Sequence, residues 1–288
     1  MLVLGGAMRT ETFQTPDEVR LDVRLGSGEI RLETADTAET TVTLEPLRDN
    51  EASATAVAEA RVELRGQEIV VDVRDRRRGF RGADVLVEIH CPSGASVRAK
   101  SGSADVEGHG RFGSVEVETG SGDVQFSEVS GDAEINAASG DVQLASIGGE
   151  ARINTASGDV QVAAIAGDAK INSASGDVML REAGGRLDVN SASGDVQIRE
   201  LGSSANLNTA SGDQTLGSVS QGKVSLKSAS GDLKIGIREG STLWVDARSR
   251  SGEVRSELPV SDLPPEGDAP HVELRANTMS GDITVVRA

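Results

Sequence analysis

The sequence predicts an all-β fold: a β-solenoid of the parallel β-helix type with 18-residue coils, preceded by a β-rich N-terminal capping region. Three observations favour it. The phrase Ser-Gly-Asp returns every 18 residues, apolar and polar residues alternate between its copies, and aromatic residues make up only 2% of the chain, against 34 Gly. A chain this poor in large side chains fills a thin interior of Val, Ile, Leu and Ala more readily than a thick globular core.

Residues 1–100 are expected to form the N-terminal capping region. They contain short alternating runs, such as VRLDVRL at 19–25 and EIVVDVR at 68–74, and a hairpin is expected at Arg65, Gly66 and Gln67. An uncapped solenoid exposes an unpaired strand edge, so a cap over the first coil protects the chain from aggregation.

Residues 101–255 are expected to form the solenoid. The repeated phrase shows five successive spacings of 18 residues and then one of 19. Between the phrases, two short alternating runs are separated by a second turn, so each repeat is predicted to hold two strands and two corners. Stacking such repeats at about 4.8 Å places Val on Val and Ile on Ile. The phrases begin at Ser121, Ser139, Ser157, Ser175, Ser193, Ser211 and Ser230.

Residues 256–288 are expected to form a Pro-rich loop followed by C-terminal strands. The loop is PVSDLPPEGDAP at 259–270, and VELRANTMSGDITVV after it returns to strand-like alternation. The sequence leaves open whether this tail is the last coil or folds back.

The aspartates of the repeated phrase are predicted to form a row along one edge of the stack. The simplest role for each is to accept hydrogen bonds from turn amides. The alternative is a calcium site, because hard cations take oxygen ligands, although the G-G-x-G-x-D nonapeptide of calcium-binding β-rolls is absent. No other cofactor is expected. The row is Asp123, Asp141, Asp159, Asp177, Asp195, Asp213 and Asp232.

A row of asparagines is predicted to stack at a corner, where the amides hydrogen-bond to one another along the axis. Its members are Asn136, Asn154, Asn172, Asn190 and Asn208.

Two further surfaces are candidates for binding a partner. The outward positions that follow the aspartates carry Gln125, Gln143, Gln161 and Gln197, a nearly uncharged stripe on an acidic chain. The stripe is either a contact surface for a partner or sister molecule, or a passive ladder. The other surface is a basic patch in a predicted loop, which is either solvated or binds an anionic partner. Its residues are Arg74, Arg76, Arg77, Arg78 and Arg81.

Charge and composition argue against several classes of function. A formal net charge of -17 repels a phosphate backbone, so nucleic-acid binding is not expected. The first residues show neither a signal peptide nor a membrane helix, and the single Cys91 suits a reducing compartment, so we expect a cytoplasmic protein without membrane insertion. Export by an unrecognised route is the alternative. His90, His109 and His271 are not spaced for zinc, and no catalytic motif is present.

The ladder of S-G-D-V-x-[LIV] phrases follows the stretch VLVEIHCPSGASVRAKSGS at 85–103. Together they resemble a bacterial, often actinobacterial, β-strand-repeat family of unknown function labelled "putative adhesin". Pro92, Ser93 and Gly94 match the P-x-G phrase of that family, and the resemblance covers roughly residues 11–288. It implies a repetitive β-solenoid and brings no catalytic residue.

We therefore expect a non-enzymatic structural or protein-interaction scaffold that binds a protein partner or associates with itself. One alternative is an exported adhesin that binds glycan or cell-wall material. Another is a self-assembling filament protein, and a less favoured one is a carbohydrate-active β-helix enzyme, because such enzymes use aromatic residues that are nearly absent here.

Overall fold

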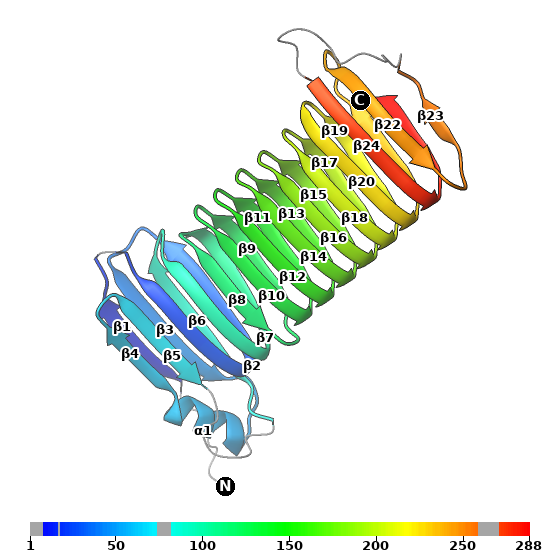
Figure 1. Cartoon of the computed structure of the whole chain (residues 1–288). Helices are drawn as coiled ribbons and strands as arrows, with labels where there is room; N and C mark the ends of the chain where they lie inside the picture. Colours follow the sequence, from blue (N-terminus) through cyan, green and yellow to red (C-terminus); the bar gives the residue numbers. More distant parts are fainter. Residues whose placement is uncertain (1–7, 17, 74–81, 259–270) are drawn as a thin grey trace. The chain divides into compact units, whose positions relative to one another are not determined.

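The structure, a computed structural model, describes residues 8–16, 18–73, 82–258 and 271–288. It confirms the all-β solenoid fold, with strands stacked in parallel, in-register rows (Figure 1). The chain divides into two compact units, residues 1–146 and 147–288, and each is described by itself. Among the described residues, no helix is long and apolar enough to cross a membrane.

Unit 1 begins with a mixed sheet and continues into parallel coils. Its helix is α1 (Glu51–Glu59). Its described strands are β1 (Arg9–Gln14), β2 (Arg20–Ala35), β3 (Glu39–Pro46), β4 (Arg61–Arg65), β5 (Glu68–Val73), β6 (Val85–Pro92), β7 (Ser96–Phe112), β8 (Val115–Thr119), β9 (Val124–Val129), β10 (Ala133–Ser139) and β11 (Val142–Ile147).

The strand β2 forms a coil that lies out of sequence order. Its first half pairs in parallel with β5 and its second half with β6, while both halves pair with β7. Parallel stacking therefore begins at β2. The division predicted at residue 100 stays a prediction, and the structure adds that β7 runs without a break through this position.

Antiparallel strands and α1 cover the outer strands β5 and β6. β4 pairs with β5, β3 with β6, and β1 with β3, all antiparallel. The hairpin predicted at Arg65–Gln67 is confirmed, and Gly66 adopts φ 63° in its turn. α1 was not predicted from the sequence. The helix buries only Ser53 and Val57, so the apolar periodicity of its sequence is weak. Asn50 caps its N-terminus, where the Asn50 side chain accepts a hydrogen bond from the Ser53 amide at 2.7 Å.

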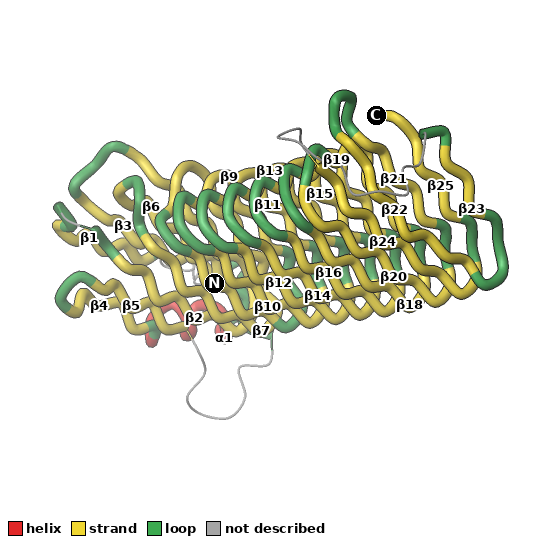
Figure 2. The backbone as a smooth tube through the Cα atoms, turned by 45° about the horizontal axis from the view of Figure 1, so that its top comes forward, coloured by secondary structure: helices red, strands yellow, loops and turns green. Residues whose placement is uncertain are grey.

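Unit 2 is a regular stack of two-stranded coils (Figure 2). Its strands are β12 (Ala151–Ser157), β13 (Val160–Ile165), β14 (Ala169–Ser175), β15 (Val178–Ala183), β16 (Leu187–Ser193), β17 (Val196–Leu201), β18 (Ala205–Ser211), β19 (Gln214–Val219), β20 (Gly222–Ser230), β21 (Leu233–Ile237), β22 (Thr242–Ser249), β23 (Val254–Ser256), β24 (His271–Ser280) and β25 (Ile283–Arg287).

The core of unit 2 consists of apolar columns that run from coil to coil. Ile153, Ile171 and Val189 are Cα partners on successive strands and are fully buried. Because the register never shifts between these coils, each apolar side chain packs on its copy in the next coil. The columns predicted from the 18-residue period are therefore confirmed.

The C-terminal strands fold back into the stack. β24 lies between β20 and β22, and β25 lies between β21 and β23, all in parallel register. The sequence left open whether the tail forms the last coil or folds back, and the structure shows that it folds back. The tail forms the penultimate coil, and β22 with β23 forms the outer one. The Pro-rich loop at 259–270 lies outside the described residues.

One core position of unit 2 is polar. Gln214 is fully buried in a column between Val196 and Leu233. Its Nε2 donates to Thr209 Oγ1 and to the Lys227 carbonyl oxygen, each at 2.9 Å. Its Oε1 has no hydrogen-bond partner among the described residues, so this side chain is only partly satisfied.

Candidate functional site

The aspartate row joins consecutive coils through the backbone. In unit 2, Asp177 Oδ1 accepts the amide hydrogen of Asp195, and Asp195 Oδ1 accepts that of Asp213, both at 2.8 Å. In unit 1, Asp123 Oδ1 accepts the amide of Asp141 at 2.8 Å. Each carboxylate thus satisfies a corner amide that points along the stack.

Calcium binding by this row stays a prediction. One oxygen of each carboxylate in the bonds above already accepts an amide, which leaves the second oxygen for solvent or an ion. Among the described residues, no group of three or more His, Cys, Asp or Glu side chains is arranged to hold a metal ion.

The asparagine row forms an amide ladder in unit 2. Asn172 Nδ2 donates to Asn154 Oδ1 at 2.7 Å, Asn190 to Asn172 at 3.0 Å, and Asn208 to Asn190 at 3.1 Å. The predicted hydrogen bonds along the axis are present there. The predicted place was wrong, because these residues lie within strands, on the outward face of β12, β14, β16 and β18, and not at a corner.

The glutamine stripe lies on the other row of strands. Gln161 on β13, Met179 on β15 and Gln197 on β17 are register partners. Both glutamines are exposed, and Met179 between them is 37% exposed. In unit 1, Gln125 on β9 and Gln143 on β11 are exposed on two strands that pair with each other. The structure thus brings the predicted residues together within each unit.

A charged row runs beside the stripe in unit 2. Ala164, Glu182, Glu200 and Ser218 are register partners on β13, β15, β17 and β19, and the two glutamates are exposed. Arg181 and Arg199 precede these glutamates on the same strands and are also exposed. The stripe is therefore a narrow neutral band with charges of both signs along one side.

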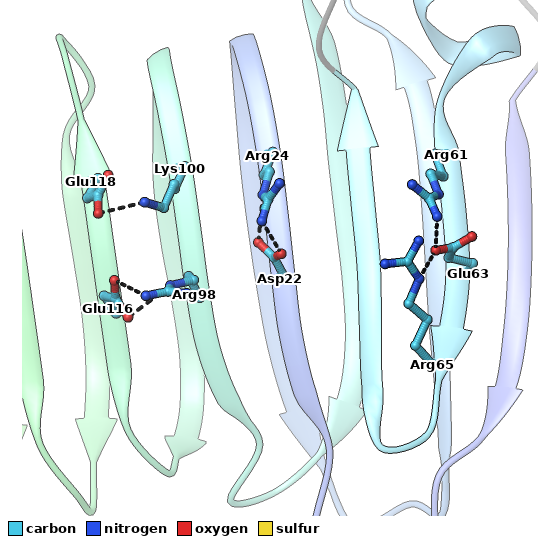
Figure 3. A network of polar contacts seen from close by, with 9 residues as sticks. All are labelled: Asp22, Arg24, Arg61, Glu63, Arg65, Arg98, Lys100, Glu116 and Glu118. Carbon is cyan, nitrogen blue, oxygen red and sulfur yellow. Dashed lines mark hydrogen bonds and ion pairs between the residues drawn. The ribbon is translucent and has the colours of Figure 1, made fainter.

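Unit 1 carries an ordered array of ion pairs that the sequence analysis missed (Figure 3). Arg98 on β7 binds Glu116 on β8 through two contacts of 2.9 and 2.7 Å, and Lys100 binds Glu118 at 2.7 Å. On β4, Arg61 and Arg65 both contact Glu63. The 18-residue spacing of Arg98 and Glu116 was the available signal, because it makes them neighbours in the stack.

Hydrogen bonding to Glu116 and its negative charge raise the pKa of the Arg98 guanidinium. The Arg98 side chain is half exposed, so solvent screens this pair and its contribution to stability is small. We interpret the array as a solvated, self-neutralised face.

A cavity of about 490 Å³ lies in unit 1 beside the C-terminal end of α1. Its walls include Glu59, Arg61, Asp72 and Asp84. Asp84 contacts the Arg48 side chain and accepts a hydrogen bond from Ser27 Oγ at 2.5 Å. Asp84 is thus paired with Arg48 and bonded to Ser27.

The isolated thiol and imidazoles do not form a site. Cys91 is fully buried, and burial raises the pKa of its thiol to about 12, which keeps it protonated and unreactive. His90 Nδ1 lies 3.1 Å from Glu33 Oε2 on the outside of the sheet. The predicted basic patch, Arg74, Arg76, Arg77, Arg78 and Arg81, lies outside the described residues.

These features place the chain in the class of repetitive β-solenoid proteins. The family model described as Toastrack DUF4097 matches residues 19–199 and 183–286. The chain belongs to the Toastrack DUF4097 family. This confirms the resemblance to a β-strand-repeat family, whereas the actinobacterial origin stays a prediction. The comparison with curated proteins gave no match.

Three solved structures that align with this chain share little sequence with it. A "putative lipid binding protein" from Parabacteroides distasonis is 13% identical over 97% of both chains, with a TM-score of 0.44. A "putative adhesin" from Bacteroides fragilis is 12% identical over 96% of this chain and 97% of its own, with a TM-score of 0.39. Another from Parabacteroides distasonis is 12% identical over 97% of both chains, with a TM-score of 0.34.

Proposed function

We propose that this protein is a non-enzymatic scaffold that binds a protein partner, or a second copy of itself, through the glutamine stripe. The observation that carries the proposal is the unbroken register of Gln161, Met179 and Gln197. This register holds their side chains on one flat face, in rows spaced about 4.8 Å apart.

The chemistry of the stripe suits an interface. Neutral amides cost less to desolvate than charged groups, and the buried centres of protein interfaces are depleted in charge. Met179 supplies an exposed, adaptable apolar contact in the middle of the stripe. The neighbouring positions carry both signs of charge, Arg181 and Glu182 on β15 and Arg199 and Glu200 on β17. They are positioned to form a mixed charged rim that favours a partner with a complementary charge pattern.

The groups with shifted pKa values support a role without catalysis. The described titratable groups with shifted pKa values are Cys91, which is buried, and the exposed Arg98 and Arg255. Cys91 lies in the core, and Arg98 lines a cavity of about 400 Å³ together with its partner Glu116. A guanidinium stays protonated and does not serve as a general acid or base.

The test compares partner capture by two double variants of the tagged full chain. Gln161→Glu with Gln197→Glu places two carboxylates in the stripe, and Ser157→Glu with Ser193→Glu places the same charges on exposed positions of β12 and β16. We expect the first variant to lose bound partner or self-association and the second to retain it. Equal capture by both variants would remove the stripe from the proposal.

We also propose a cytoplasmic location, supported by the single buried thiol of Cys91. Fractionation of the producing cells tests it. Protein recovered from the cytoplasm is expected, whereas surface or secreted protein would support the exported adhesin instead.

A further inference from the structure

The outward face of β20, β24 and β22 in unit 2 carries an unusual set of side chains. Register partners place them in three rows across the strands. The rows are Lys223, Glu273 and Trp244; then Ser225, Arg275 and Asp246; then Lys227, Asn277 and Arg248. We call this surface the Trp244 face.

The Trp244 face is basic on an acidic protein. It holds four basic residues, Lys223, Lys227, Arg248 and Arg275, and two acidic ones, Asp246 and Glu273, while the chain carries a net charge of -17. The third row has no carboxylate, because Asn277 separates Lys227 from Arg248. Lys227 is exposed and makes no ion pair with the described residues, whereas Arg248 Nε lies 3.2 Å from Asp246 Oδ1.

Trp244 is the single Trp of the chain and lies on the outside of the coil. Its strand neighbours Leu243 and Val245 pair with the buried Val272 and Leu274, so the indole points to the opposite, outward side. The residue is half-buried, and the Arg275 guanidinium lies 5.8 Å from the ring centroid.

Glu273 is held in place between the two flanking strands. Its Oε2 lies 3.4 Å from Lys223 Nζ and its Oε1 lies 2.8 Å from Arg275 Nη2. The Glu273 side chain is 20% exposed. Arg275 links the Glu273 carboxylate to the Trp244 ring, so these three groups are held together on the sheet, as a preorganised binding surface requires. The Lys223 side chain is 81% exposed.

We propose that the Trp244 face binds an anionic polysaccharide whose sugar rings carry carboxylates. The apolar face of a sugar ring packs on the exposed part of the indole, which offers a large, rigid contact area. The Glu273 carboxylate accepts hydrogen bonds from sugar hydroxyls. Lys227 and Arg248 bind the sugar carboxylates, and guanidinium geometry matches a carboxylate.

The geometry also sets the length of the ligand. Trp244 and Arg248 lie four residues apart on β22, a separation of about 13 Å in a strand. A single sugar cannot reach both side chains, so an oligosaccharide is expected to bind far more tightly than the monosaccharide.

A nucleic acid fits the face less well. It presents a dense row of phosphates to a protein of net charge -17, and four basic residues offset only part of that repulsion. Stacking of bases also uses several aromatic side chains in most single-strand binders, and this face has one.

This inference is independent of the proposed scaffold function, because the glutamine stripe lies on β13, β15 and β17 and the Trp244 face on β20, β24 and β22. Loss of partner capture by the stripe variants and loss of sugar binding are separate readouts.

The experiment uses the full chain and hexagalacturonate as the probe, with calorimetry and the emission of the single Trp as readouts. Galacturonic acid, the neutral cellohexaose and a twelve-residue oligothymidylate are the comparison ligands. The variants are Trp244→Ala, Trp244→Phe, and Lys227→Gln combined with Arg248→Gln. Lys234→Gln, an exposed position on β21, removes the same kind of charge away from this face.

We expect hexagalacturonate to change the Trp emission and to bind with an affinity that falls about tenfold or more in Trp244→Ala and in the double variant. Lys234→Gln should bind as the parent does. Trp244→Phe, which preserves the coil if Trp244→Ala unfolds it, should bind with intermediate affinity. The proposal is overturned by no binding, by equal binding of cellohexaose, by tighter binding of the oligonucleotide, or by unchanged affinity in folded Trp244 variants.

Discussion

The carboxylate of Asp195 accepts a hydrogen bond from the backbone amide of Asp213, one coil further along the stack, at 2.8 Å. The same bond joins Asp159 to Asp177 and Asp213 to Asp232. In each case, the Asp side chain at the corner supplies the acceptor for the amide of the next coil, at a place where the strands on either side have ended. The repeated aspartate is therefore part of the mechanism that stacks the coils of unit 2.

This role predicts that the acceptor matters more than the charge. We expect Asp195→Ala to lower the free energy of unfolding by about 1 kcal/mol, because the Asp213 amide loses its partner. Asp195→Asn keeps an acceptor oxygen and should cost less. Urea unfolding of both variants is the measurement, with the exposed Gln197→Ala on the same coil as control. Equal losses in the Ala and Asn variants would show that charge is the important property.

Calcium binding by the aspartate row predicts a stabilising effect of the ion. If the row holds calcium, removal of the ion by EDTA lowers the melting temperature, because a ligand of the folded state stabilises it. Differential scanning calorimetry with calcium, magnesium or EDTA is the measurement. An identical melting temperature in all three solutions would end the calcium interpretation and leave the amide bonds as the role of the row.

Close stacking of the corners predicts a severe effect of a methyl group at Gly194. This residue adopts φ 120°, and an added Cβ would lie 2.1 Å from the Gly176 carbonyl oxygen. We expect Gly194→Ala to destabilise the protein by more than about 2 kcal/mol through backbone strain and steric clash. Gly202→Ala, where the nearest atom is 3.4 Å away, is the matched control and should change little in the same urea titration.

The polar position in the core predicts a stabilising substitution. Gln214→Leu matches its column neighbour Leu233 and removes a buried oxygen that has no partner among the described residues. We expect the free energy of unfolding to rise by about 1 kcal/mol, because the variant no longer buries an amide oxygen without a partner. The loss of the two hydrogen bonds made by Nε2 keeps this increase small. Thermal unfolding measures it. A lower melting temperature would mean that the bonds to Thr209 and Lys227 outweigh the unsatisfied oxygen.

Burial of Cys91 predicts a decline of stability in alkali. The thiol ionises near 9.0 in the unfolded chain and near 12 in the folded one. Between these values the folded state binds more protons, so stability is complete below pH 9 and falls as the pH rises. The loss reaches about 1.4 kcal/mol at pH 10.

The control for this effect is Cys91→Ala, which cannot ionise at that position. Urea unfolding at pH 8 and pH 10 should show that the parent loses about 1 kcal/mol more than the variant. Equal losses in the two proteins would assign the alkaline decline to other groups.

The sequence predicted the regular coils because one period governs both strands and corners. The 18-residue spacing alone places Ile153 on Ile171 and Asn154 on Asn172, and the structure of unit 2 has both. The out-of-order coils could not be predicted. β2 pairs with β5 and β7, and β24 inserts between β20 and β22, so neighbours in the stack are not neighbours in the sequence there.

The candidate surfaces were predictable only where they repeat. Gln161 and Gln197 stand at equivalent positions, and their exposure and alignment follow from the period. Trp244 occurs once, and its neighbours Glu273 and Arg275 come from a strand about thirty residues later that enters the stack from outside the sequence order. No local pattern connects these residues, so the Trp244 face could not be predicted from the sequence.

The glutamine stripe is proposed to bind a protein partner or a second copy of the chain. Its most direct test is quantitative capture from extracts of the producing cell, with the parent chain and the Gln161→Glu, Gln197→Glu variant as baits and an untagged copy of the chain present. We predict that one protein, or the untagged copy, is retained by the parent and by the Ser157→Glu, Ser193→Glu control but depleted about tenfold on the stripe variant. Identical retention on all three baits would show that the stripe is not the binding surface.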